Sequence, residues 1–465
     1  QSTFKPFEGI EKSDVVLELY EKWVNTLNDE KTDDDTLFTI TKRCCELGRD
    51  FFIVFINQGS SQLLHKFLLT IKEIDLMDKN WPLIASAFVY LLEGNSNVLH
   101  INQKKYFDSL FTLLTTMSND FQLCFKLADL FHSIRPLKIP SFTFNWIQLV
   151  SERHFVLQML SHIEGWDRMA TILSDFVAAL VYASDIHVKG VMDNFYNSLL
   201  RFILVIAHDF QDFLSLFAPE FVSLIPPSFS QLHNIILSVA PSGTKFQPFN
   251  KKQVLKTPGI DEFKPLAQPS KGLIEKLHFN DILNFKPSSN PNEPNPTARY
   301  MNEFIDTLES SLSYAVISSF VVYATNVTMP TVTAAQIMNQ NFKLLPLNIV
   351  LIELIKRLKP NAQYLVFNAI LDMVRYPCRS TLFYIHFVLL LFHDPPSDSN
   401  EIKSDELMFR VFLERATPVP PHPWGFRILV SQILIDNQAK LLEKPFIKGN
   451  QQIIQFIKKR EESFQ

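Results

Sequence analysis

Glycine is scarce in this sequence, and its scarcity limits the possible folds more than any other feature does. Only 11 of the 465 residues are glycine, about 2.4% against a typical usage of about 7%. The closest pair, Gly48 and Gly59, stands eleven positions apart. The motifs GxGxxG, GxxxxGK and GxSxG are therefore absent, which excludes the usual dinucleotide fold, the P-loop and the nucleophile elbow. Turn-rich all-β architectures are equally disfavoured.

Composition and charge describe a packed chain without a general affinity for nucleic acid. Hydrophobic residues make up 47% of the sequence and charged residues 20%, far from the composition of disordered proteins. The net charge of -4 offers no overall attraction to phosphates. The four cysteines form no CxxC motif, and the first residues have neither the basic start nor the apolar run of a signal peptide, so we expect an intracellular protein.

Helical periodicity recurs along almost the whole chain. Residues 13–27 place apolar side chains on one face, and residues 404–416 carry charges every four positions opposite an apolar face. Residues 199–217 read as one helix that is apolar except for a single polar stripe. Residues 51–56 fit either a strand or a helix by residue type. We expect an all-α, HEAT-like α-solenoid of about twenty antiparallel helices, although no repeat of fixed period is visible.

Proline divides this helical pattern near its middle. Nine of the 27 prolines fall between residues 241 and 300, and eight lysines against four acidic residues give residues 245–286 a charge of 8 - 4 = +4. We predict an N-terminal helical array in 1–240, a Pro- and Lys-rich extended connection in 241–298 with one short helix near 271–285, and a C-terminal array in 299–465. The connection is interpreted as a linker; the alternative is a segment that packs across the helices or receives a partner.

Two apolar stretches do not qualify as membrane spans. Residues 382–392 are too few, because a spanning helix needs about 20 apolar positions. Residues 310–342 lack charge but contain Ser, Thr, Asn and Pro throughout. We expect no membrane contact.

The ionisable residues show no catalytic or metal-binding pattern. His208 and Asp212 have the i, i+4 spacing of a metal pair, but no third ligand is evident. The acidic run at residues 29–35 lacks the glycine and the closing Glu of a calcium loop. Cys44 and Cys45 fit buried structural thiols. We therefore predict no cofactor, no metal and no enzymatic activity.

The segment Pro418–Gly425 allows two interpretations. It satisfies PxxP twice, the pattern that SH3 and WW domains bind. Alternatively, Pro423 begins a helix and Trp424 packs against the preceding one. We favour the second interpretation.

Several motifs, in their order along the chain, resemble one family. PHPWG at Pro421–Gly425 is similar to the C-terminal homology domain of Not-one, the scaffold subunit of the CCR-NOT mRNA deadenylase complex. The same family is resembled by LYEKWV from Leu19, RPLKIPSFTFNWIQLVSERHFVLQML from Arg135, LLRFILVIAHDFQDFL from Leu199, IPPSFSQLHNIILSVAP from Ile225, ARYMNEFI from Ala298 and AQYLVFNAILDMVRYP from Ala362.

This resemblance implies a non-catalytic HEAT-like platform. It implies docking of the Not-two and Not-three/Not-five subunits and of RNA-binding adaptor peptides of the Nanos type, in support of mRNA deadenylation, translational repression and mRNA decay. It also implies residence in the cytoplasm, including mRNA-decay granules, and in the nucleus. The family-motif positions that we name as protein-binding candidates are Arg375, Tyr376, Pro377, His422, Pro423 and Trp424. The alternative is an α-solenoid adaptor of nuclear transport or translation.

Overall fold

The described part of the chain is helical throughout. The computed structural model describes residues 13–29, 31–95, 103–185, 190–246, 265–287, 296–397, 400–436 and 438–464, and no strand occurs among them. Residues 51–56, which also fitted a strand, lie in helix α3 (Arg49–Gln58). The all-α prediction is confirmed. Within these ranges no helix combines the length and the apolar character that crossing a membrane requires.

The chain forms two compact units, residues 1–202 and 203–465. Helix α11 (Val191–Asp209) runs through the boundary. The division differs from the predicted one at residues 240 and 241. Helices α12 (Gln211–Leu224) and α13 (Ser230–Ser238) belong to the second unit, because they pack against its helices α17 (Tyr314–Thr328), α20 (Pro360–Asp372) and α22 (Ser404–Ala416). We therefore describe each unit by itself.

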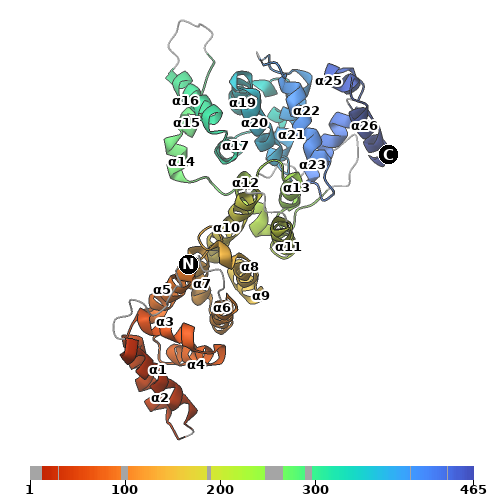
Figure 1. The fold of residues 1–465 in the computed structure, drawn as a ribbon. Coiled ribbons are helices and arrows are strands. Elements are labelled where there is room, and N and C mark those ends of the chain that lie inside the picture. The colour runs from red at the N-terminus through yellow and green to blue at the C-terminus, as the bar shows by residue number, and fades with distance from the viewer. Residues whose placement is uncertain are drawn as a thin grey trace. The chain divides into compact units, whose positions relative to one another are not determined.

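The N-terminal unit is a stack of helices in two rows. Odd-numbered helices contact the next odd-numbered helix from α1 to α9, and even-numbered helices do the same from α2 to α8. Such contacts between alternate helices are typical of an α-solenoid (Figure 1). The helices are α1 (Ser13–Asn28), α2 (Asp34–Glu46), α3 (Arg49–Gln58), α4 (Ser61–Glu73), α5 (Met77–Asn95), α6 (Gln103–Met117), α7 (Phe121–Ser133), α8 (Thr143–Val150), α9 (Arg153–Ser161) and α10 (Trp166–Asp185).

Aromatic side chains fill the core of this stack. The Trp23 ring packs edge-on against Phe55 and Phe67, with centroids 5.5 and 5.0 Å away. Trp23 is fully buried, and its indole N–H donates to Thr41 Oγ1 at 3.0 Å. This bond satisfies the only polar group of the indole and ties α1 to α2.

The C-terminal unit contains the remaining helices around one large hydrophobic core. Helix α17 contacts α12 and α20, and α20 contacts α22, so these four helices form the centre of the unit (Figure 1). The helices are α12 (Gln211–Leu224), α13 (Ser230–Ser238), α14 (Lys271–Lys276), α15 (Phe279–Leu283), α16 (Pro296–Ser311), α17 (Tyr314–Thr328), α18 (Ala334–Ile337), α19 (Pro346–Arg357), α20 (Pro360–Asp372), α21 (Arg379–His393), α22 (Ser404–Ala416), α23 (Trp424–Ser431), α24 (Gln438–Glu443), α25 (Pro445–Lys448) and α26 (Gln451–Phe464).

Local chemistry explains where many of these helices begin. The Asp120 carboxylate accepts the backbone N–H groups of residues 122 and 123 at the start of α7. Thr333 and Gln336 form a reciprocal capping box at α18. Helices α19, α20 and α25 begin with proline, whose missing N–H costs nothing at a first helical position.

The segment predicted as one helix at residues 199–217 is two helices. Phe210 takes φ -133° and ψ 54° between α11 and α12, outside the helical region. Neither Pro nor Gly stands at this break, so the sequence carries none of the usual signals for it.

In the predicted connection at 241–298, helix is present where a short helix was predicted near 271–285, but the linker interpretation is wrong for the described central part. Residues 265–287 pack into the C-terminal unit with two short helices, α14 and α15. Leu266, Phe279, Ile282 and Phe285 are buried in the core, so this part packs across the helices, as the alternative interpretation had it. Residues 247–264 and 288–295 of the connection lie outside the described residues.

Candidate functional site

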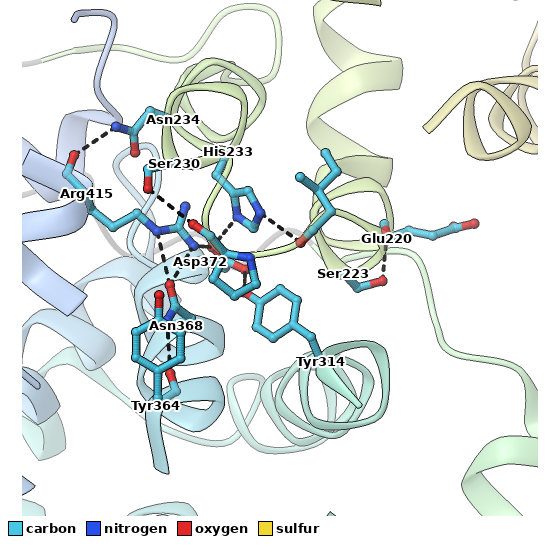
Figure 2. Close-up of polar contacts among 12 residues, drawn as sticks. Glu220, Ser223, Ser230, His233, Asn234, Tyr314, Tyr364, Asn368, Asp372 and Arg415 are labelled. Carbon is cyan, nitrogen blue, oxygen red and sulfur yellow. Dashed lines mark hydrogen bonds and ion pairs between the residues drawn. The ribbon is translucent and has the colours of Figure 1, made fainter. Parts of the chain in front are cut away.

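Six polar residues from four helices meet inside the C-terminal unit, and we call them the polar core. They are His233 and Asn234 of α13, Tyr314 of α17, Asn368 and Asp372 of α20, and Arg415 of α22. All six are buried, with at most 8% of any residue exposed. Figure 2 shows the side chains of Arg415, Tyr314 and His233 pointing toward Asp372, and that of Asn234 pointing toward the Arg415 backbone.

The Asp372 carboxylate is the centre of this network. Arg415 Nη2 donates to Asp372 Oδ1 at 2.7 Å, and the Tyr314 hydroxyl donates to Oδ2. Arg415 also donates to Asn368 Oδ1 at 3.3 Å, and the Asn234 amide donates to the Arg415 carbonyl at 2.9 Å. A buried charge pair is stable only when further hydrogen bonds surround it, and these bonds meet that need.

His233 lies beside this network as a neutral ring that donates to a backbone carbonyl and not to Asp372. Its Nε2–H donates to the Ile225 carbonyl at 3.1 Å, while Nδ1 lies 3.4 Å from Asp372 Oδ1. Complete burial and the nearby Arg415 charge hold the pKa of His233 below its usual value, against the opposing effect of Asp372. The imidazole is therefore uncharged at pH 7.

The same surroundings shift the pKa values of Asp372 and Tyr314. Burial raises the pKa of Asp372, but the Arg415 charge and the Tyr314 hydrogen bond together lower it below the ordinary value. Burial and the Asp372 charge raise the pKa of Tyr314 well above its usual value. At pH 7 the polar core thus holds one carboxylate and one guanidinium.

The polar core holds helices together. A Tyr–Asp–His arrangement resembles the proton relay of an active site, but all these side chains are closed off from solvent and no substrate atom can reach them. Sequence analysis missed the polar core because its members are far apart in the chain: His233 and Asp372 are 139 positions apart. No local spacing signals such a contact.

The two family motifs that carry the predicted binding residues lie against each other. The Gly425 N–H donates to the Arg375 carbonyl at 2.5 Å. A Cβ at Gly425 would lie 2.4 Å from Thr381 Cγ2 and 2.9 Å from that carbonyl oxygen, so only glycine allows this approach. The Arg375 N–H donates to Thr381 Oγ1 at 3.1 Å. The motifs therefore join the turn after α20 to the start of α23.

The six predicted binding residues differ in their exposure. Arg375, Tyr376 and Pro423 are buried, whereas Pro377, His422 and Trp424 are partly exposed. Arg375 Nη2 donates to the Ser215 carbonyl at 2.7 Å, and its guanidinium lies 5.0 Å from the centre of the Tyr376 ring. Of the two interpretations of Pro418–Gly425, the structure agrees with the helix start. Helix α23 begins at Trp424, one residue later than expected, and Pro423 directly precedes it.

The residues considered as metal ligands or reactive thiols take part in ordinary structural contacts or are buried. His208 Nδ1 pairs with Asp209 at 2.6 Å, and Asp212 accepts the Ser242 N–H at 2.8 Å. His208 and Asp212 lie on different helices, α11 and α12, and contact different partners. No group of three potential metal ligands occurs within the described ranges. Burial raises the pKa of Cys44 far above its usual value and that of Cys45 to about 12, which leaves both as unreactive thiols.

The stacked N-terminal helices and the helical C-terminal unit define a HEAT-like helical protein. Comparisons with known proteins give the family. Residues 108–460, about three quarters of the chain, match the family model described as "CCR4-Not complex component, Not1". The chain belongs to this family, whose members are non-catalytic scaffold subunits of the CCR4-Not complex.

Curated relatives and solved structures agree with this assignment. The chain is 26% identical over 395 residues to general negative regulator of transcription subunit 1 of Schizosaccharomyces pombe. The alignment covers 81% of this chain and 18% of the relative. The Saccharomyces cerevisiae protein of the same name is 23% identical over 367 residues, 70% of this chain and 16% of the relative. The chain thus spans less than a fifth of the length of these relatives.

Two solved structures share the fold. The NOT1 superfamily homology domain from Chaetomium thermophilum superposes with a TM-score of 0.78 at 20% identity, covering 95% of this chain and 97% of that one. A Not1 C-terminal domain in complex with Not4 gives a TM-score of 0.71 at 18% identity, covering 94% and 99%. At these identities the likeness concerns the fold.

Proposed function

We propose that this chain is a docking scaffold of the CCR4-Not complex. It holds other subunits and RNA-binding adaptors, and it supports mRNA deadenylation, translational repression and mRNA decay while other subunits remove poly(A). The observation that carries the proposal is the family match over residues 108–460. The tightly bonded polar core supports it, because a rigid platform binds partners at a low entropic cost.

The partners in this proposal are the Not-two and Not-three/Not-five subunits and adaptor peptides of the Nanos type. A Not4-type subunit joins them, because a structurally similar Not1 C-terminal domain is known in complex with Not4. The proposed locations are the cytoplasm, including mRNA-decay granules, and the nucleus.

The proposed mode of attachment is wrapping by linear regions. Stacked helices present grooves that suit extended or short helical segments. Such segments lose conformational entropy on docking, so a stable complex needs a long contact. Large apolar side chains are also exposed on both units, among them Ile163 at 74% and Leu344 at 62%.

Trp424 and His422 remain candidates for contact with a partner protein. Trp424 packs partly on the core, and the His422 ring stacks on Phe426 with centroids 6.2 Å apart. Replacing the partly exposed pair with alanine tests binding, whereas replacing buried Arg375 or Tyr376 also tests folding.

Co-purification tests the function. The tagged chain should recover the Not subunits from a cell extract, identified by mass spectrometry. Deleting the linear regions of the Not-two and Not-three-like subunits, with their folded domains intact, should abolish recovery. Undiminished binding of the folded domains alone would contradict wrapping, and recovery of transport receptors or translation factors without Not subunits would contradict the scaffold assignment.

A further inference from the structure

The connection between α17 and α19 presents an exposed surface without charge. Ten of the sixteen residues at 327–342 are exposed, and none of the sixteen is acidic, basic or histidine. We call these ten exposed residues the uncharged surface. A chain in which 20% of the residues are charged would place about three charges in such a stretch. Charged side chains prefer the protein surface, so their absence from exposed positions needs a physical reason.

Buried residues and hydrogen bonds hold this connection in one conformation. Arg379 Nη1 of α21 donates to the backbone carbonyls of residues 329 and 332 at 3.3 and 3.2 Å. The Asn348 amide donates to the carbonyl of residue 342 at 2.7 Å. The residues that anchor the connection in the core are Met329, Val332, Ile337 and Phe342. A surface that is already ordered loses little conformational entropy when a partner binds.

The uncharged surface offers one apolar side chain and two open amides. Met338 is 50% exposed, and methionine is enriched at the centre of protein interfaces, where charged residues are depleted. Gln340 and Asn341 are exposed, and their side-chain amides make no hydrogen bond within the described part of the chain. A side-chain amide both donates and accepts, so these two groups can bond the backbone N–H and C=O of a peptide.

The size and the charge of this surface select its occupant. A stable interface between two folded chains uses about 20–30 residues a side, whereas ten are exposed here. The next residue, Lys343, is paired with Asp394 at 3.4 Å. The uncharged surface therefore fits a short segment and not a second copy of the chain. A charged group on that segment would lose hydration without gaining a partner, so the segment is uncharged.

We propose that the uncharged surface binds a short extended segment of a partner protein that carries aliphatic side chains and no charge. An aliphatic side chain packs on Met338, and the backbone of the segment bonds the amides of Gln340 and Asn341. The proposal rests on the proposed docking function for the partner, but its test needs no CCR4-Not subunit. Failure of this test therefore leaves the scaffold proposal standing, and failure of the pull-down leaves this site standing.

Methyl NMR of the full chain with ¹³C-labelled methionine gives the test, and Met338→Leu assigns the Met338 signal. The probes are blocked pentapeptides with leucine at positions 2 and 4 and with serine, glutamate or lysine at the other three positions. The serine peptide should shift the Met338 signal and bind at least about threefold more tightly than either charged peptide. Its counterpart with N-methylated leucines should bind more weakly, because it lacks two backbone donors.

Each of these comparisons has an outcome that contradicts the proposal. Equal binding of the serine peptide and a charged peptide overturns the charge argument. Equal binding of the N-methylated peptide overturns the backbone contact. A Met338 signal that no peptide shifts overturns the site.

Three variants locate the site. Met338→Lys and Gln340→Lys each place a charge on the uncharged surface and should weaken the serine peptide at least about fivefold. Ile402→Lys is the matched control, because Ile402 is an apolar residue of the same unit that is 42% exposed, and it should leave the affinity unchanged. Unaltered affinity in Met338→Lys and Gln340→Lys, or an equal loss in Ile402→Lys, overturns the proposal. A dimer of the unliganded chain in sedimentation, dissociated by Met338→Lys, overturns the choice of occupant.

Discussion

At the residue scale, Asp372 shows how a carboxylate is kept charged inside an apolar helical protein. Its two oxygens accept hydrogen bonds from Arg415 and Tyr314, and both of these residues are buried. Arg375 is the contrasting case. It is also buried, but its guanidinium makes one hydrogen bond, from Nη2 to the Ser215 carbonyl, while Nε and Nη1 have no partner among the described residues.

This contrast predicts that the same substitution, Arg to Met, destabilises the chain strongly at residue 415 and only slightly at residue 375. Arg415→Met leaves Asp372 as an uncompensated buried charge and should lower the free energy of unfolding by about 3–5 kcal/mol. Arg375→Met removes a buried cation that has no carboxylate in contact, so its effect should stay within about 1 kcal/mol. Thermal unfolding measures both. Equal destabilisation by the two variants would contradict this account, and Asp372→Leu combined with Arg415→Met should recover most of the loss.

The polar core also predicts a pH dependence of stability. The pKa of His233 is lower in the folded chain than its ordinary value of 6.5, so the unfolded chain binds the proton more readily. The contribution of His233 is complete above pH 6.5 and decreases as the pH falls below it, by at most about 1.4 kcal/mol per pH unit.

His233→Gln should therefore flatten the melting temperature between pH 7.5 and pH 5.5 relative to the unsubstituted chain. His208→Gln is the matched control, because His208 is exposed beside Asp209. Identical pH profiles for the His233 variant and the unsubstituted chain would show that His233 does not titrate in this way.

At the element scale, the start of α23 depends on its close approach to the turn after α20. Gly425 lies at this approach, and its N–H donates to the Arg375 carbonyl. The PHPWG and RYP motifs are therefore parts of one packing arrangement. Contact of Trp424 with a partner stays a prediction.

Gly425→Ala should destabilise the chain by about 1–3 kcal/mol, since the added methyl must displace Thr381 or the α20 turn. Gly272→Ala in α14 is the control, because nothing lies within 4 Å of the added Cβ, and alanine at this exposed helical position should be neutral or stabilising. Thermal melting of both variants distinguishes the outcomes. A loss of stability in Gly272→Ala alone would contradict the packing argument.

At the scale of the whole molecule, stability comes from apolar helix packing. Both units bury aromatic and aliphatic side chains in quantity. The cysteine thiols belong to this packing, and burial raises the pKa of Cys124 to about 11 and that of Cys45 to about 12. A thiolate is the form that binds a metal, and it is rare at pH 7 in such sites.

Removal of metal ions by a chelator should consequently leave the structure and the stability of the chain unchanged. Dialysis against EDTA is expected to alter neither the helical far-ultraviolet circular dichroism nor the melting temperature. The thiols should react with a disulfide reagent only after unfolding. Stoichiometric zinc in the purified chain, or a lower melting temperature after chelation, would contradict this prediction.

The amino-acid sequence by itself determined the helical class and the family. Periodic apolar positions and scarce glycine act locally, so the ranges 13–27 and 404–416 could be recognised as helices without coordinates. The ordered motifs were sufficient to indicate the Not-one family. Only the tertiary structure decided which distant residues meet: His233 with Asp372, and Gly425 with Arg375. It likewise showed that residues 265–287 belong to the core, because burial depends on the surrounding helices, which no local pattern of prolines and lysines specifies.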